Sequence, residues 1–183
     1  MVNTSYLIAI FYLTLHYSVY HVFMTHSISN VVFDVDGVLT DGTFYYSIDG
    51  KVLKRFGSHD AQAINKCLTF FNLQLISADK RGFEISKLRA EHLGLPITYV
   101  PEDLRSDWIL GHFVREETAL VVDSFTDIPS LMSVARSFAP INAHPELINR
   151  VSDVLKTSGG GGAVAEVLDI LLYEKLKKHL WEI

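Results

Sequence analysis

The stretch from Val31 to Thr40, VVFDVDGVLT, constrains the fold of this chain more than any other. It is an apolar run that ends in Asp34 and Asp36, followed directly by Gly37. Residues i and i+2 of a strand point to the same face, and glycine permits a sharp turn beyond the strand end. Carboxylates placed in this way bind a hard cation such as Mg²⁺, or serve as nucleophile and general acid/base. A strand followed by an ordinary Asp–Gly turn is the alternative interpretation.

The rest of the sequence alternates between strand-like and helix-like segments, with no internal repeat. This alternation predicts an α/β fold with a doubly wound, Rossmann-like parallel sheet flanked by helices. The stretch between Asp41 and Ser77 is too short for a large cap domain. After the first strand, we expect strands at 73–79, 96–100, 118–123 and 137–141, and a brief extended piece at 153–155. We expect helices at 61–70, 84–93, 103–113, 128–135, 145–151 and 163–180.

Three of the expected strands end in polar side chains. Asp34 and Asp36 follow the first strand, Ser77 lies near the end of the second, and Asp123 closes the fourth. In parallel α/β sheets, ligands bind outside the carboxyl ends of the strands, at a switch point in strand order. The sequence therefore predicts that separated segments bring these groups to one edge of the sheet, which favours a catalytic or metal site over an ordinary turn.

A β-hairpin is expected directly after the acidic stretch, over residues 43–56. Two β-rich runs flank Asp49 and Gly50, which is a strong hairpin signal. Phe44 and Tyr46 alternate with smaller or polar positions. The hairpin has two possible roles, as a wall of the site or as a contact with another subunit, and its aromatic side chains favour the second.

The composition indicates a folded globular protein and excludes some classes of partner. Hydrophobic residues make up 49% of the chain, charged residues 20%, and the net charge is −5 without a basic block. Nucleic acid is therefore not expected as a partner. An anionic substrate remains compatible with this charge, because a bound Mg²⁺ reverses the local field. Cys67 is the only cysteine, which excludes an internal disulfide and favours a small core residue in a cytoplasmic protein.

The first 27 residues form an apolar extension ahead of the expected domain at 28–183. Residues 1–33 contain no Asp, Glu, Lys or Arg, and residues 6–24 are largely apolar and aromatic. A spanning helix needs about 20 such residues, so a membrane anchor is one interpretation, and contact with a membrane is expected only through 6–24. The other two interpretations are a packing segment and an upstream extension ahead of a domain that begins near Met24. We favour the last.

The chain resembles the haloacid dehalogenase superfamily of aspartate-nucleophile phosphatases. Within it, the chain is similar to the small uncapped branch typified by 3-deoxy-D-manno-octulosonate 8-phosphate phosphatase. That branch includes the phosphatase-like domain of acylneuraminate cytidylyltransferases. The resemblance covers about residues 30–175. It is carried by DVDGVLTDG at 34–42, by Tyr45, Tyr46, Gly50, Lys51, Lys54, Phe56 and Asp60, and by AHP at 143–145 and GGGAVAE at 160–166.

The resemblance implies a role for each of the clustered residues. Asp34 would attack phosphorus to form an aspartyl-phosphate, and Asp36 would protonate the leaving sugar oxygen and then deprotonate water. Mg²⁺ would be held by Asp34, the backbone carbonyl of Asp36, and Asp123, with Asp127 a further acidic residue at the family spacing. Ser77 would donate a hydrogen bond to a phosphoryl oxygen. Members of the branch assemble as tetramers through the hairpin, so a homotetramer through residues 43–56 is expected.

Several positions depart from the family pattern. The second motif, usually Thr-Gly-Arg, reads Ser77-Ala78-Asp79 here, so Lys80 or Arg81 would replace the arginine. The lysine of the third motif falls on Arg105, with Lys80 as the other candidate. Asp60, at the start of an expected helix, is a candidate for substrate contact, and helix capping is the alternative. The fourth motif lacks its glycine and middle carboxylate, VDSFTD at 122–127, and Ala165 replaces a terminal arginine.

Two hypotheses about function follow from these motifs. The first is Mg²⁺-dependent hydrolysis of a phosphate monoester of a sugar acid through an aspartyl-phosphate. The substrate would be 3-deoxy-D-manno-octulosonate 8-phosphate, from lipopolysaccharide synthesis, or a sialic-acid-like phosphate. The second is a weakly active or inactive domain that serves oligomerisation in a nonulosonic acid or sugar-nucleotide pathway. The altered second to fourth motifs favour reduced activity, whereas the complete Asp-x-Asp pair favours catalysis.

Overall fold

The computed structural model describes residues 27–181, and the side chains of residues 27–178. The interpretations offered for the apolar segment 6–24 lie outside this part of the chain. Within the described residues, no helix is both long enough and apolar enough to cross a membrane.

The core of the fold is one parallel sheet, which confirms the predicted α/β class. Its order is β5-β4-β1-β6-β7-β8, so β1 lies in the middle, and every pair of neighbours is parallel. The order reverses at β1, between β4 and β6, which is the switch point where such sheets bind ligands. The strands are β1 (Asn30–Asp34), β4 (Asn72–Ser77), β5 (Ile97–Tyr99), β6 (Thr118–Val121), β7 (Arg136–Ala139) and β8 (Asp153–Val154).

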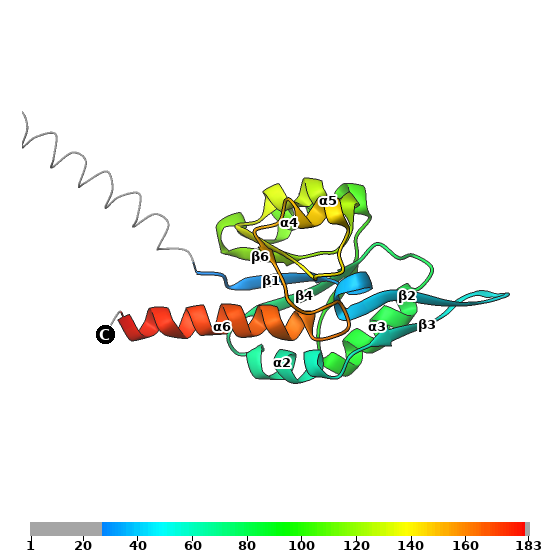
Figure 1. The fold of residues 1–183 in the computed structure, drawn as a ribbon, viewed down its shortest axis with the longest axis horizontal. Helices are drawn as coiled ribbons and strands as arrows, with labels where there is room; N and C mark the ends of the chain where they lie inside the picture. The colour runs from blue at the N-terminus through cyan, green and yellow to red at the C-terminus, as the bar shows by residue number, and fades with distance from the viewer. Residues whose placement is uncertain (1–26, 182–183) are drawn as a thin grey trace, which may run out of the picture.

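Helices cover both faces of the sheet (Figure 1). One face carries α2 (His59–Cys67), α3 (Phe83–Leu93) and α6 (Ala163–Trp181). The other carries α4 (Arg105–His112), α5 (Pro145–Ile148) and the 3₁₀ helix Phe125–Ser133. Because both faces are covered, a strand in the middle of the sheet is apolar at successive positions and does not alternate with polar residues.

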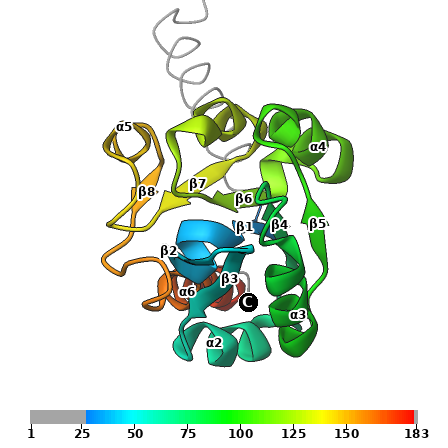
Figure 2. The ribbon, with the colours of Figure 1, turned by 90° about the vertical axis from the view of Figure 1, so that its right-hand side faces the viewer.

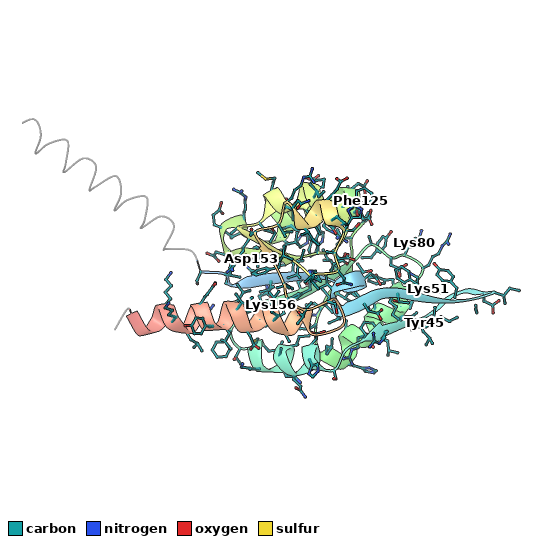
Figure 3. All side chains as sticks on the ribbon, in the orientation of Figure 1. Tyr45, Lys51, Lys80, Phe125, Asp153 and Lys156 are labelled. Carbon is teal, nitrogen blue, oxygen red and sulfur yellow. The ribbon has the colours of Figure 1, made fainter. Side chains whose placement is uncertain are left out.

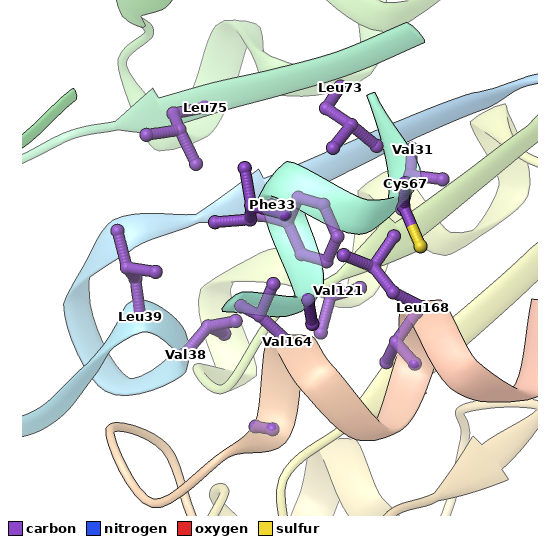
Figure 4. Packing of buried hydrophobic residues seen from close by; sticks show 14 of the residues in the cluster. Val31, Phe33, Val38, Leu39, Cys67, Leu73, Leu75, Val121, Val164 and Leu168 are labelled. Carbon is purple, nitrogen blue, oxygen red and sulfur yellow. The ribbon is translucent and has the colours of Figure 1, made fainter. Parts of the chain in front are cut away.

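The side chains of β1 show this two-sided burial directly. Val31 and Phe33 pack in the cluster that contains Leu168 of α6, whereas Val32 packs in the cluster on the opposite face with Ile109 of α4. Figure 4 shows Phe33 among the residues of the first cluster. Cys67 is fully buried in the same cluster, as predicted for a small core residue.

Two predicted helices are wholly or partly 3₁₀ helices in the structure. The segment expected as one helix at 103–113 is a 3₁₀ turn, Glu102–Leu104, followed by α4, so Arg105 is the first residue of an α-helix. The segment expected at 128–135 is the 3₁₀ helix Phe125–Ser133, which begins earlier because Ser124 and Asp127 form a capping box. The remaining 3₁₀ turn is Arg115–Glu117.

The hairpin is formed by β2 (Thr40–Ser47) and β3 (Gly50–Phe56), paired antiparallel. It follows β1 through the tight loop Val35–Leu39 and projects beyond the carboxyl edge of the sheet (Figures 1 and 2). Within the described residues, no large cap domain accompanies the hairpin. Its exposed apolar side chains are Phe44, Tyr45, Tyr46, Ile48, Val52 and Leu53.

Candidate active site

Asp34 is fixed at the end of the central strand by its neighbours. Its Oδ1 accepts a hydrogen bond of 2.7 Å from the backbone N–H of Val35, and its Oδ2 accepts one of 3.1 Å from Nη1 of Arg105. Only 6% of Asp34 is exposed. Arg105 also forms an ion pair with Asp127, so one guanidinium joins the end of β1 to the 3₁₀ helix after β6. Arg105 thereby holds the carboxylates of Asp34 and Asp127 in fixed positions beside each other.

A glycine allows the loop after β1 to approach Asp123 closely. Gly37 has a φ of +80°, a left-handed conformation that favours glycine. A Cβ added at Gly37 would lie 1.8 Å from Oδ2 of Asp123. The absence of a side chain here therefore lets the Asp123 carboxylate lie against the loop that carries Asp36.

Three carboxylates converge at a point where a divalent cation fits. Oxygens of Asp34, Asp123 and Asp127 lie within 4.8 Å of one another. Burial, together with the charges of Asp34, Asp127 and Asp36, raises the pKa of Asp123 to about 8. Burial also raises the pKa of Asp127 to about 7, against the opposing charge of Arg105. One guanidinium does not neutralise three carboxylates, and carboxylate oxygens are the ligands that Mg²⁺ prefers, so the residues present suit a hard divalent cation.

Metal binding is expected to strengthen as the pH rises toward 8. Asp123, with a pKa of about 8, must lose its proton before it binds a cation. The ordinary pKa of this group is 3.8. As the pH rises from that value to about 8, the folded protein without metal therefore loses free energy of unfolding, because the Asp123 carboxylate is harder to ionise in the fold than in the unfolded chain. The rise in melting temperature on adding Mg²⁺ to chelator-treated protein should therefore be larger at pH 8 than at about pH 6. An equal rise at both pH values would contradict this assignment.

Asp36 is oriented by groups from two other elements. Nζ of Lys54, on β3, lies 2.8 Å from Oδ1 of Asp36, and Oγ of Ser77 donates a 3.1 Å hydrogen bond to Oδ2. Lys54 is itself buried and donates a hydrogen bond of 2.7 Å to Oγ of Ser86. Asp36 is therefore held by side chains from the hairpin and from the end of β4, in a position suited to proton transfer to a bound ligand.

Asp34, Asp36 and Asp123 line a cavity of about 420 Å³ at the carboxyl edge of the sheet. The volume lies within the range of small-molecule sites. Carboxylates and two cations, with a few apolar groups, make up the wall, as expected for a site that binds a metal together with a polar anionic ligand. The lining residues are Asp34, Asp36, Gly37, Gly42, Phe44, Lys51, Ala78, Asp79, Glu102, Arg105, Asp123 and Ser124.

Two of the residues proposed from the sequence lie elsewhere. Lys80 is exposed and is not among the lining residues, whereas Lys51 is. Figure 3 labels both lysines. Asp60 is 1% exposed, and its Oδ1 accepts a 3.0 Å hydrogen bond from the backbone N–H of Ala165, at the start of α6. The geometry therefore matches the capping alternative for Asp60, although the helix that it caps is distant in sequence. The other proposed residues lie together: Asp34, Asp36, Ser77, Arg105, Asp123 and Asp127.

Sequence reasoning left three side chains of this site without a role. Lys51 and Lys54 come from β3, and Asp79 follows β4. Nζ of Lys51 lies 2.5 Å from Oδ2 of Asp79. The spacing of these lysines on the hairpin matches the family motif, but that spacing alone does not indicate where their side chains lie.

The comparisons with known proteins agree with this geometry. No family model matches the chain. The 3-deoxy-D-manno-octulosonate 8-phosphate phosphatase KdsC of Haemophilus influenzae is 30% identical over 162 residues, which cover 85% of this chain and 89% of that protein. The chain belongs to this phosphatase family. The family lies within the haloacid dehalogenase superfamily, and the chain is accordingly a phosphoric monoester hydrolase.

Solved structures support the same assignment and the metal site. The cobalt-bound phosphatase of Haemophilus influenzae superposes with a TM-score of 0.73 at 29% identity, over 86% of this chain and 94% of that one. A structure assigned to the haloacid dehalogenase superfamily, from Legionella pneumophila, gives 0.75 at 26% identity, over 92% and 95%. The metal-bound relative and the carboxylate cluster of this chain together support binding of a divalent metal by this phosphatase.

Proposed function

We propose that this phosphatase hydrolyses the phosphate monoester of a 3-deoxy sugar acid, with Mg²⁺ as its metal. The leading candidate substrate is 3-deoxy-D-manno-octulosonate 8-phosphate, because the relatives are named as phosphatases of this compound. A sialic-acid-like phosphate is the second candidate. The observation that carries the proposal is the placement of Asp34 and Asp36 in one cavity beside Arg105 and the carboxylate cluster. We place the enzyme in the cytoplasm, in keeping with its single, buried cysteine.

The reaction divides between two carboxylates. Asp34 attacks phosphorus while Asp36 gives its proton to the leaving sugar oxygen, so the phosphorus–oxygen ester bond breaks as the aspartyl-phosphate forms. Asp36 then takes a proton from water, which attacks phosphorus and releases phosphate and the Asp34 carboxylate. Arg105 donates hydrogen bonds to phosphoryl oxygens and balances their charge. Mg²⁺, when bound by the carboxylate cluster, neutralises charge that builds up on the phosphoryl group.

A substrate panel tests the proposal. Phosphate release is measured from 3-deoxy-D-manno-octulosonate 8-phosphate, a sialic-acid-like 9-phosphate and neutral sugar phosphates, each with Mg²⁺ and with a chelator. Release from at least one sugar acid phosphate, and its loss with the chelator, is expected. If no ester releases phosphate and calorimetry detects no Mg²⁺ binding, the proposal fails and the weakly active, assembly-related alternative is supported.

We also propose that the chain forms a homotetramer through its hairpin. The apolar side chains of this element are unusually exposed, with Tyr46 60% and Leu53 59% accessible. Exposed apolar patches of this kind mark interaction sites. Light scattering after gel filtration should give a tetramer for the native chain and smaller species for Tyr46→Glu/Leu53→Glu. Leu110→Glu, at a similarly exposed position on α4, is the matched control and should stay tetrameric. A monomeric native chain, or a variant that remains tetrameric, would refute the assignment.

A further inference from the structure

Asp79 forms ion pairs with two lysines of the hairpin, Lys51 and Lys54. Its Oδ2 lies 2.5 Å from Nζ of Lys51 and 2.9 Å from Nζ of Lys54. Its Oδ1 accepts a hydrogen bond of 3.1 Å from the backbone N–H of Gly82, and its own N–H donates one of 3.1 Å to Oγ of Ser77. The carboxylate is therefore fixed by the backbone after β4, and the lysines are fixed by the carboxylate.

The cluster is buried and closely packed. The side chains of Lys51 and Lys54 are 4% and 0% exposed, and Nζ of Lys51 lies 3.3 Å from the ring centroid of Phe44. A Cβ on Gly82 would lie 2.3 Å from Oδ2 of Asp79, so the glycine leaves room for these charges. Burial raises the pKa of Asp79, but hydrogen bonds from Lys51 and Lys54 outweigh it and lower the pKa to about 2. Asp79 is thus charged under all ordinary conditions.

The two cations that line the cavity have different partners. Arg105 is bonded to Asp34 and Asp127, so it lies on the side of the nucleophile and the phosphate. Lys51 is the other cation among the described lining residues, and its ion-pair partner is Asp79. An anionic group on the leaving sugar therefore has to compete with Asp79 for Lys51, whereas a neutral hydroxyl does not.

We propose that Asp79 determines the selectivity of the cavity for the leaving group: by engaging Lys51 and Lys54, it reduces the preference for a sugar acid over a neutral sugar phosphate. The inference rests on the proposed phosphatase function. Asp79→Asn keeps the size of the side chain and an oxygen for the N–H of Gly82, but it removes the negative charge that pairs with Lys51. The freed Lys51 then binds a substrate carboxylate through a charge-assisted hydrogen bond.

The test compares a sugar acid phosphate with a neutral one. The ratio of kcat/KM for 3-deoxy-D-manno-octulosonate 8-phosphate to that for arabinose 5-phosphate is measured with Mg²⁺. It should rise about tenfold in Asp79→Asn, mainly through a lower KM for the sugar acid. Lys51→Met/Asp79→Asn should abolish the gain. The matched control is Asp169→Asn, which removes a 3.1 Å surface ion pair with Lys66 and should leave the ratio unchanged. An unchanged or lower ratio in Asp79→Asn would overturn the inference.

A binding measurement separates this inference from the proposed function. If the native chain releases no phosphate from either ester, turnover cannot report the selectivity, and the dissociation constants of the two esters from the Mg²⁺-loaded protein are compared by calorimetry instead. Asp79→Asn should then bind the sugar acid phosphate about tenfold more tightly, with little change for the neutral ester. Equal changes for both esters, or none for either, would refute the role of Asp79.

Discussion

Replacing Asp34 by asparagine is expected to lower kcat by at least about 10⁴-fold, because the amide removes the group that attacks phosphorus. The loss should appear with every substrate that the native chain hydrolyses, since attack by Asp34 is common to all of them. Initial rates of phosphate release at saturating Mg²⁺ provide the measurement. Turnover within tenfold of the native rate would refute the assignment of Asp34 as nucleophile.

The same variant should fold at least as stably as the native chain when metal is removed. Burial raises the pKa of Asp34, against the charge of Arg105, so its ionised form is unfavourable in the folded state. A raised folded pKa means that stability is lost as the pH rises through the titration range, and a neutral amide avoids this loss. The melting temperature of Asp34→Asn in chelator should therefore equal or exceed the native value at pH 8. A large decrease would show that lost activity reflects misfolding.

Of the substitutions considered for stability, removal of the buried Arg105 cation is expected to have the largest effect. Arg105→Met leaves Asp34 and Asp127 buried without a positive partner, which should cost about 3–5 kcal/mol of unfolding free energy in chelator-treated protein. Addition of Mg²⁺ should restore part of this loss, because the cation binds the same carboxylates. The loss should shrink below pH 7, since Asp127, with a pKa of about 7, takes up a proton there and no longer needs a partner.

Two further variants control for the loss of any arginine. Arg105→Lys keeps the charge but not the forked geometry, so an intermediate loss of stability is expected. Arg150→Met removes an exposed arginine that pairs with Glu146 at 3.7 Å, and its effect should stay below about 1 kcal/mol. Urea unfolding, followed by circular dichroism, gives the free energies. An Arg105→Met variant as stable as Arg150→Met would show that the buried cluster needs no cation.

The sequence predicted the arrangement of the acidic residues because it depends on simple geometry. Parallel strands bring their carboxyl ends to one edge, so Asp34, Ser77 and Asp123 had to approach one another once the strands were recognised. The helix expected at 84–93 is α3, and Gly94, the next residue, ends it in a left-handed conformation that favours glycine. These features depend on local patterns and on one rule of topology.

The remaining features depend on distances that no local pattern specifies. Lys51 reaches the cavity and Lys54 contacts Asp36 because the hairpin, which follows the loop Val35–Leu39, runs past the end of β4. Asp60 stands at the start of its own helix, yet it caps α6, more than a hundred residues later in the sequence. Contacts of this kind depend on tertiary packing, so a sequence pattern offers only alternatives.

The most direct test is to trap the covalent intermediate. The Mg²⁺-loaded protein is mixed with 3-deoxy-D-manno-octulosonate 8-phosphate and quenched in acid within a single turnover, and its peptides are analysed by mass spectrometry. Phosphate is expected on the peptide that contains Asp34, and it should be absent after chelation and from Asp34→Asn. Substrate turnover without phosphate on Asp34, or with phosphate on another residue, would contradict the proposed mechanism.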